Sequence, residues 1–192
     1  MRLEVELKFP VLDFGPVVAQ LAGLGAEISP PQEEVDRYYA HPARNFAQTD
    51  EALRIRQKGG KCFLTYKGPK LDPNTKTRQE IDLPLPPGPD TLAAWDTLLQ
   101  ALGFQPVAEV QKLRQKAFLT WQEDRVEISL DEVANLGYFV ELELVTDQAG
   151  LELARSALFA LANQLGLSQS ERRSYLELLL EKRLAQEKHT RP

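Results

Sequence analysis

The chain has 192 residues, of which 43% are hydrophobic and 27% are charged, a balance typical of one soluble domain with its own core. Lys and Arg number 23 against 28 Asp and Glu, and the net charge of −5 argues against a general nucleic-acid binder. A single Cys and two His exclude a disulfide framework and a zinc site of the usual ligand types. No segment approaches the roughly 18 apolar residues of a membrane helix. The N-terminal segment lacks the apolar stretch of a signal peptide, so we expect a cytoplasmic protein with no membrane partner.

Residues 3–9 alternate between apolar and charged side chains, which predicts a strand with one apolar face and one charged face. A short amphipathic helix, capped by Asp13, is expected to follow and to end near Gly23 and Gly25. The next strands are predicted at 33–40, 52–58, 61–67 and 76–83. The second and third of these are joined by Lys58-Gly59-Gly60-Lys61, a strong hairpin signal.

The second half of the chain begins with a proline-rich connection at 83–89 that leads into a predicted helix at about 90–102. Three more strands are expected at 107–120, 125–133 and 138–146. Apolar periodicity then predicts helices at about 151–166 and 174–187. Eight strands and about four helices without an internal repeat indicate an α+β domain built around an antiparallel sheet.

The alternation of the first strand recurs in the other predicted strands, so the sheet has an apolar face and a charged face. One interpretation is an open sheet with helices on one side and water on the other. Two observations argue against it: Thr, Gln, Asn and Ser are sparse on the charged face, and cations and carboxylates are concentrated on different strands. In a barrel with its apolar face outward, the charges would line a polar lumen. Charges held there must pair or bind ions, which points to a ligand that is both anionic and metal-bound, such as a polyphosphate.

A set of short motifs follows in order along the chain. The motifs are Glu4-x-Glu6-x-Lys8, Asp36-x-Tyr38-Tyr39, Leu53-Arg54-Ile55-Arg56, Leu64-Thr65-Tyr66-Lys67-Gly68-Pro69, Arg78-x-Glu80, Lys112-x-Arg114, Ile128-x-Leu130-Asp131-x-Val133, Leu136-Gly137-x-Phe139-x-Glu141-x-Glu143 and Ser174-Tyr175-x-x-Leu178-Leu179. This ordered set resembles one known family, the CYTH domain of the triphosphate tunnel metalloenzyme superfamily. The resemblance implies an eight-stranded antiparallel β-barrel with flanking helices over residues 1–180, followed by a helix end and tail at 181–192. It also implies that Mg²⁺ or Mn²⁺ supports chemistry on a triphosphate.

Two pairs of carboxylates are the candidate metal ligands. Glu4 with Glu6, and Glu141 with Glu143, each project two carboxylates to one side of a strand, and hard oxygen ligands suit Mg²⁺ or Mn²⁺. By resemblance these four residues bind the metal, and Asp131 completes the set. The alternative is that these carboxylates lie on a solvated surface.

Basic side chains are the candidate triphosphate ligands, because guanidinium and ammonium groups match phosphate oxygens and stabilise charge that grows during phosphoryl transfer. The predicted set is Lys8, Arg54, Arg56, Lys67, Arg78, Lys112, Arg114 and, near the tunnel mouth, Arg173. Glu80 is expected to form a structural ion pair with a neighbouring Arg, whereas Lys58 and Lys116 are expected on a solvated face.

Lys8 and Tyr38 resemble a catalytic pair that orients or deprotonates a water; for Tyr38, aromatic packing is the equally weighted alternative. Cys62, Trp95 and Trp121 are expected to be packing residues.

The leading functional hypothesis is a metal-dependent hydrolase of a small-molecule triphosphate, acting as a monomer or homodimer. The candidate substrates are inorganic tripolyphosphate, thiamine triphosphate and a nucleoside triphosphate. A class IV adenylate cyclase, which makes cyclic AMP and pyrophosphate from ATP, is the first alternative. A non-catalytic polyphosphate or nucleotide sensor is the second. Motifs of other enzymes, such as G-x-S-x-G and G-x-x-x-x-G-K-[ST], are absent from the sequence.

Overall fold

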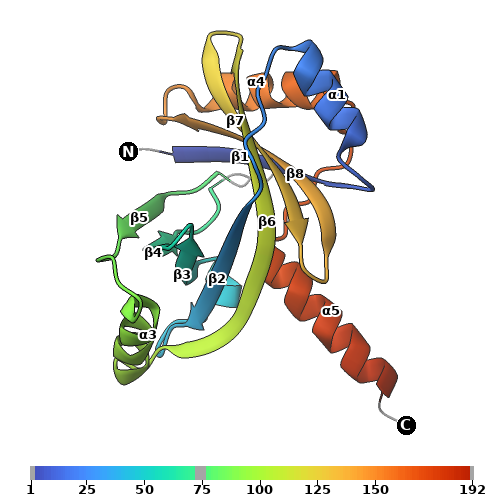
Figure 1. Ribbon diagram of the computed structural model, residues 1–192. Helices are drawn as coiled ribbons and strands as arrows, with labels where there is room; N and C mark the ends of the chain where they lie inside the picture. Colours follow the sequence, from blue (N-terminus) through green and yellow to red (C-terminus); the bar gives the residue numbers. More distant parts are fainter. Residues whose placement is uncertain (1–2, 72–76, 191–192) are drawn as a thin grey trace.

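The computed structural model describes residues 3–71 and 77–190, and within them eight antiparallel strands form one sheet accompanied by five helices (Figure 1). The strands are β1 (Leu3–Val11), β2 (Gln32–Ala40), β3 (Ala52–Lys58), β4 (Lys61–Lys67), β5 (Glu80–Pro84), β6 (Gln105–Trp121), β7 (Asp124–Val133) and β8 (Gly137–Thr146). The helices are α1 (Gly15–Gly23), α2 (Phe46–Thr49), α3 (Thr91–Ala101), α4 (Leu151–Gln164) and α5 (Tyr175–Thr190). The spatial order of the strands is β1-β8-β7-β6-β2-β3-β4-β5. This architecture confirms the predicted α+β class.

The sheet is curled so that its first and last strands approach each other. Just before β5, Arg78 forms a two-bond bridge with Glu4 of β1, in which each backbone N–H donates to the other residue's carbonyl at 3.3 Å. The predicted strand at 76–83 is therefore shorter, because the chain at Arg78 pairs with β1 before it joins β4 at Glu80. Residue 76 lies outside the described residues. The bridge joins the two edges of the sheet and gives it the form of a barrel.

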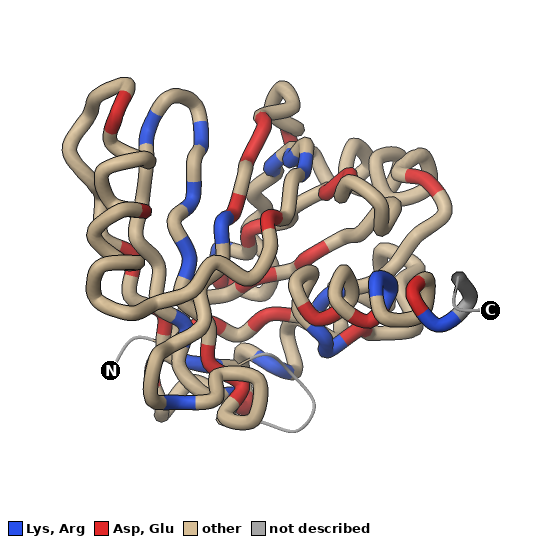
Figure 2. Tube along the Cα trace, turned by 90° about the horizontal axis from the view of Figure 1, so that it is seen from below, with Lys and Arg blue, Asp and Glu red and all other residues tan. Residues whose placement is uncertain are grey.

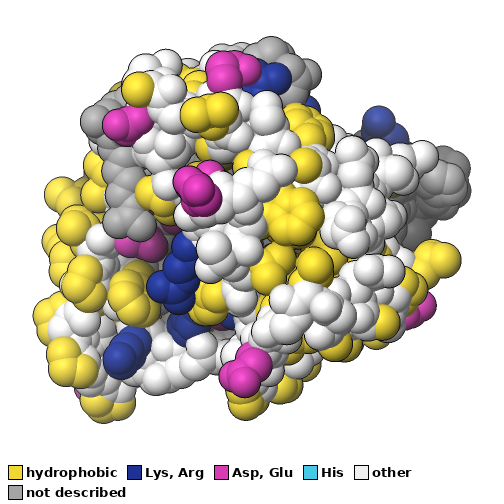
Figure 3. Space-filling model, turned by 90° about the horizontal axis from the view of Figure 1, so that it is seen from above, with side chains coloured by type: hydrophobic (Ala, Val, Ile, Leu, Met, Phe, Trp, Pro, Cys, Tyr) yellow, Lys and Arg dark blue, Asp and Glu magenta, His cyan; other side chains and the backbone are white. Residues whose placement is uncertain are grey.

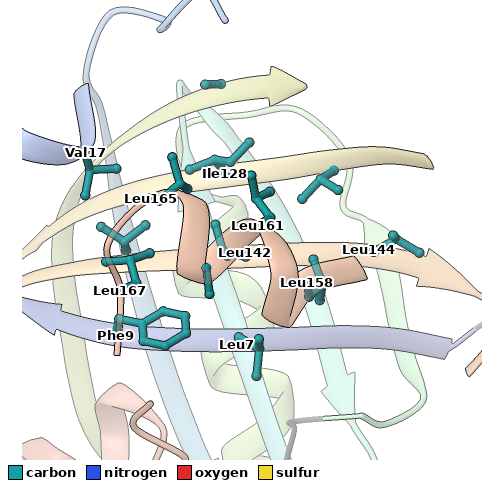
Figure 4. Close-up of a cluster of buried hydrophobic side chains, with 14 of the residues drawn as sticks. Leu7, Phe9, Val17, Ile128, Leu142, Leu144, Leu158, Leu161, Leu165 and Leu167 are labelled. Atoms are coloured by element: carbon teal, nitrogen blue, oxygen red, sulfur yellow. The ribbon is translucent and has the colours of Figure 1, made fainter. Parts of the chain in front are cut away.

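The apolar face of the sheet is directed outward and is covered by helices, as the alternation predicts. Against one half of the sheet, α4 packs Leu158 and Leu161 on Leu142 and Ile128 (Figure 4). Trp121 packs against the edge of this cluster. These contacts leave the other face of the sheet, with its charged side chains, directed inward.

A second cluster covers the outer face of β3 and β4. Ile55 and Cys62 pack there with Leu99 of α3, and Trp95 lies against them. The expectation that Cys62 and the two tryptophans are packing residues is thus confirmed.

One end of the inner face is apolar and is closed by α5. Val110, Val133 and Phe139 share the inward face with the charged residues, and Tyr175 and Leu179 of α5 pack on them. The remaining turns of α5 extend away from the sheet, and residues 181–188 are exposed (Figure 1). None of the described helices is both long and apolar enough to cross a membrane.

Two helix starts differ from the sequence-based expectation. Asp13 accepts a hydrogen bond from the Gly15 N–H at 2.7 Å, but Phe14 occupies the cap position of α1.

The single turn α2 was not predicted, because four residues are too few to show a helical period. Its cap, Asn45, accepts a hydrogen bond from the Gln48 N–H at 3.3 Å. This turn matters because it forms part of the wall of the central cavity.

Candidate active site

The charged inner face encloses a cavity of about 680 Å³ to which every strand of the sheet contributes. Acidic positions follow one another along some strands and basic positions along others (Figure 2). One face of the molecule is hollowed, and Lys and Arg side chains gather in the hollow (Figure 3). The sequence-predicted residues that line the cavity are Glu4, Glu6, Tyr38, Arg54, Arg56, Lys67, Arg78, Glu80, Lys112, Arg114, Glu141 and Glu143. The structure thus brings together side chains that are far apart in the sequence.

Neighbouring strands β1, β8 and β7 form an acidic wall. The register places Glu6 opposite Glu143, and Glu143 opposite Glu127 on the next strand. Burial, together with Glu80 and Glu143, raises the pKa of Glu4 well above its usual range. Burial, together with Glu6 and Glu127, raises the pKa of Glu143 in the same direction. Without a bound cation, the protonated forms of Glu4 and Glu143 are therefore favoured.

The donor set of this wall suits a hard divalent cation. Its side chains are carboxylates, the ligand type that Mg²⁺ and Mn²⁺ take. Among the described residues, no three His, Cys, Asp or Glu side chains already lie in the arrangement of a metal ligand shell. Mg²⁺ keeps several waters and takes substrate phosphate oxygens as well, so one or two protein carboxylates are sufficient for it. The crowded carboxylates fit such an ion, because its charge would relieve their mutual repulsion.

The opposite side of the cavity is basic, and its cations surround two buried carboxylates on β2. Asp36 accepts hydrogen bonds from Arg56 at 2.6 and 2.7 Å and from Arg54 at 3.1 Å. Glu34 pairs with Lys58 at 2.7 Å and with Lys112 at 3.2 Å. The cations hold the pKa of both carboxyl groups low although burial acts to raise it.

No role was predicted for these two carboxylates. The sequence did contain the information, because Glu34 and Asp36 alternate along the strand with Tyr38 and therefore lie with it on the inner face. At the centre of the basic side lies Lys112, which is buried. Burial and the positive charges of Arg114 and Arg56 lower its pKa to about 8.

Asp131 was predicted as a metal ligand, and the structure gives it other partners. It is completely buried, accepts a hydrogen bond from Arg114 Nε at 2.6 Å, and accepts another from the Tyr175 hydroxyl at 2.7 Å. Asp131 is not among the residues that line the cavity, whereas Arg114 is. Arg114 also contacts Glu141 at 2.5 Å. Asp131 therefore lies behind Arg114 and orients it, with Tyr175 of α5 as its second support.

Lys8 and Arg173 also differ from the expected arrangement. The Lys8 ammonium is buried, donates to the Arg173 carbonyl, and lies 4.1 Å from the centroid of the Tyr175 ring. The Arg173 side chain is about half exposed and binds Glu171 at 2.9 Å and Glu181 at 2.6 Å, away from the cavity lining. The reason is local: α5 begins over Lys8, so the backbone of residue 173 approaches the site while its side chain points outward.

The remaining predicted residues form ion pairs in the cavity wall. Glu80 lies between Arg54, at 3.3 Å, and Lys67. The Tyr38 hydroxyl accepts a weak hydrogen bond from Arg54 at 3.4 Å. Lys116 lines the cavity and pairs with Glu127, contrary to the solvated face expected for it. Lys58 pairs with Glu34 and lies outside the cavity lining.

Comparison with known proteins agrees with this arrangement. The CYTH domain matches residues 2–175, and the chain belongs to this family. A protein of Methanocaldococcus jannaschii named "Putative adenylate cyclase MJ0240" is 35% identical over 179 residues, which cover 92% of this chain and 98% of that one.

Solved structures show the same fold. The PH1819 protein of Pyrococcus horikoshii is 41% identical, with a TM-score of 0.82 and coverage of 93% of this chain and 99% of that one. A Vibrio parahaemolyticus protein, likewise named as an adenylate cyclase candidate, is 27% identical, with a TM-score of 0.77 and coverage of 92% and 97%.

Proposed function

We propose that this protein is a divalent-metal-dependent hydrolase of a triphosphate substrate. The observation that carries the proposal is the division of one cavity into a crowded acidic wall and a basic side whose cations are buried. A metal cation alone would neutralise only the acidic wall, and an anion alone would pair only with the basic side. A metal-bound triphosphate satisfies both, because its oxygens accept from the basic groups and share the metal with the carboxylates.

The residues divide into two groups in this proposal. Glu4, Glu6, Glu141 and Glu143 would hold Mg²⁺ or Mn²⁺. When bound, the ion supplies neutralisation of phosphate charge and a more acidic water. The phosphates would be bound by Arg54, Arg56, Lys67, Arg78, Lys112 and Arg114.

In the reaction, the oxygen of a water forms a bond to the terminal phosphorus as the bridging oxygen leaves with the diphosphate. The basic side stabilises the charge that builds on that leaving group. Tyr38 lines the cavity, and its hydroxyl would orient the water, while Lys8 would contribute positive charge from beneath Tyr175.

A second candidate is adenylate cyclase activity, in which the ribose 3′-hydroxyl attacks the α-phosphorus of ATP and expels pyrophosphate. Two observations favour keeping it: the names of the relatives, and an apolar part of the cavity wall that an organic group could contact. That part includes Phe46 of α2 with Leu176 and Leu180 of α5. A non-catalytic sensor is less favoured, because an anion binder has no need of four crowded carboxylates.

Product analysis separates these functions. The protein is incubated with tripolyphosphate, thiamine triphosphate or ATP, each with Mg²⁺ or Mn²⁺, and phosphate, pyrophosphate and cyclic AMP are resolved. We expect tripolyphosphate to give one phosphate and one diphosphate per turnover. Cyclic AMP formed in equal amount to pyrophosphate, with tripolyphosphate acting only as an inhibitor, would replace the hydrolase by the cyclase. Binding of all three compounds without any product would indicate the sensor.

A further inference from the structure

The carboxylate of Asp36 is the meeting point of three cations that come from two different strands. Arg56 binds it through two nitrogens at 2.6 and 2.7 Å, Arg54 approaches to 3.1 Å, and the Lys112 ammonium lies at 3.6 Å. Only 1% of Asp36 is exposed, so water does not compete for these contacts. We propose that Asp36 is a positioning residue that fixes the three cations around it before the phosphates of a substrate arrive. The proposal rests on the proposed function, because it assigns phosphate binding to those cations.

The charge balance explains why a carboxylate is useful in a site for anions. Arg54, Arg56, Lys58, Lys67 and Lys112 share three carboxylates, Asp36, Glu34 and Glu80, so the cations outnumber the carboxylates by two. The carboxylates reduce the repulsion among the cations without cancelling the attraction for phosphate. Arginine forks held in this way lose little further freedom when they bind an anion, which favours the transition state as well as the substrate.

Asp36 also keeps Lys112 charged. The titratable groups around Lys112 come from every element packed against it. They are Glu34 and Asp36 of β2, Arg56 of β3, Arg114 of β6, Asp131 of β7 and Tyr175 of α5. Asp36 and Asp131 favour its protonated form, whereas Arg114, Arg56 and burial oppose it. Below a pH of about 8 Lys112 therefore binds phosphate as a cation, and above it this attraction is lost. Without the charge of Asp36, the loss will begin at lower pH.

The test compares Asp36→Asn with the wild type, measuring kcat/KM for tripolyphosphate with Mg²⁺ from pH 6 to 9. We expect a decrease of roughly tenfold at pH 6, as for the loss of hydrogen bonds between charged groups. The decrease should be larger at pH 8. The alkaline limb of the kcat/KM profile reports the pKa of Lys112 in the free enzyme, and we expect the variant to lower that pKa by roughly one unit. Glu109→Gln is the matched control: Glu109 binds Arg37 at 2.6 Å outside the cavity lining, and its loss should leave the profile unchanged.

A second readout needs no turnover. NMR titration of the lysine side-chain signals, with Lys112 assigned from Lys112→Arg, should show a lower pKa for Lys112 in Asp36→Asn. If that variant does not fold, Glu34→Gln, which removes the carboxylate 3.2 Å from Lys112, takes its place. An unchanged titration of Lys112 together with a pH-independent loss of activity would overturn the proposal. A wild type that neither binds nor hydrolyses any triphosphate would instead refute the proposed function, and the titration would still decide the role of Asp36.

Discussion

Glu4→Gln and Glu143→Gln are each expected to lower kcat for the triphosphate substrate by roughly 100-fold or more, about 3 kcal/mol or more in the activation free energy. Glutamine keeps the size of the side chain but removes the negative charge and the strong oxygen donor that a divalent ion needs. The loss should be greatest at low metal concentration and should diminish as Mg²⁺ is raised. The rate of phosphate release as a function of free Mg²⁺ measures both effects.

The stability of the same variants separates a metal-binding role from a structural one. The raised pKa of Glu143 means that its ionised form is disfavoured in the folded protein. Without metal, the free energy of unfolding therefore falls as pH rises from the ordinary pKa of 4.5 towards the raised one. Glu143→Gln removes this penalty, so its Tm in chelator at pH 7 should equal or exceed that of the wild type. The exposed Glu132→Gln serves as the control. Full activity in both cavity variants would place these carboxylates outside the reaction.

Arg54→Gln and Arg56→Gln are expected to lower kcat/KM by about 2–4 kcal/mol, with effects on both kcat and KM. Each arginine offers a planar fork of donors to phosphate oxygens, and the neutral amide offers neither the charge nor the geometry. Steady-state kinetics with tripolyphosphate and Mg²⁺ measure the change.

Arg37→Gln is the matched control for the arginine variants, since Arg37 makes a comparable ion pair with Glu109 outside the cavity lining. Its removal should cost less than about 1 kcal/mol, as is usual for a partly exposed pair. Losses below about 0.5 kcal/mol for both Arg54 and Arg56 would mean that they act only as the cations of structural ion pairs.

The strand period made much of the site predictable from the sequence. Because side chains alternate between the two faces, the parity of Glu141 and Glu143, and of Arg54 and Arg56, was sufficient to put them on the charged face. The outward direction of the apolar face followed from helices that needed a surface to cover. Motif order then indicated the barrel, and the bridge between Glu4 and Arg78 shows where its edges meet.

The alternation of side chains predicts the face of the sheet on which a residue lies, but not the residues that it contacts there. Asp131 shares a face with Glu127 but lies nearer the end closed by α5, where Tyr175, 44 residues away, donates to it. Lys8 was likewise placed on the correct face, but the start of α5 covers it. Such contacts depend on where a helix docks, and helix docking leaves no local signal in the strand.

The most direct test of the central claim is the rate of phosphate release from tripolyphosphate by the wild-type protein while free Mg²⁺ or Mn²⁺ is varied with a chelator. A metal ion that joins the acidic wall to the phosphates predicts a rate that rises to saturation with the ion and vanishes in excess chelator. Substantial turnover in excess chelator would contradict the account, as would a protein that gains neither turnover nor affinity for any triphosphate when the metal is supplied.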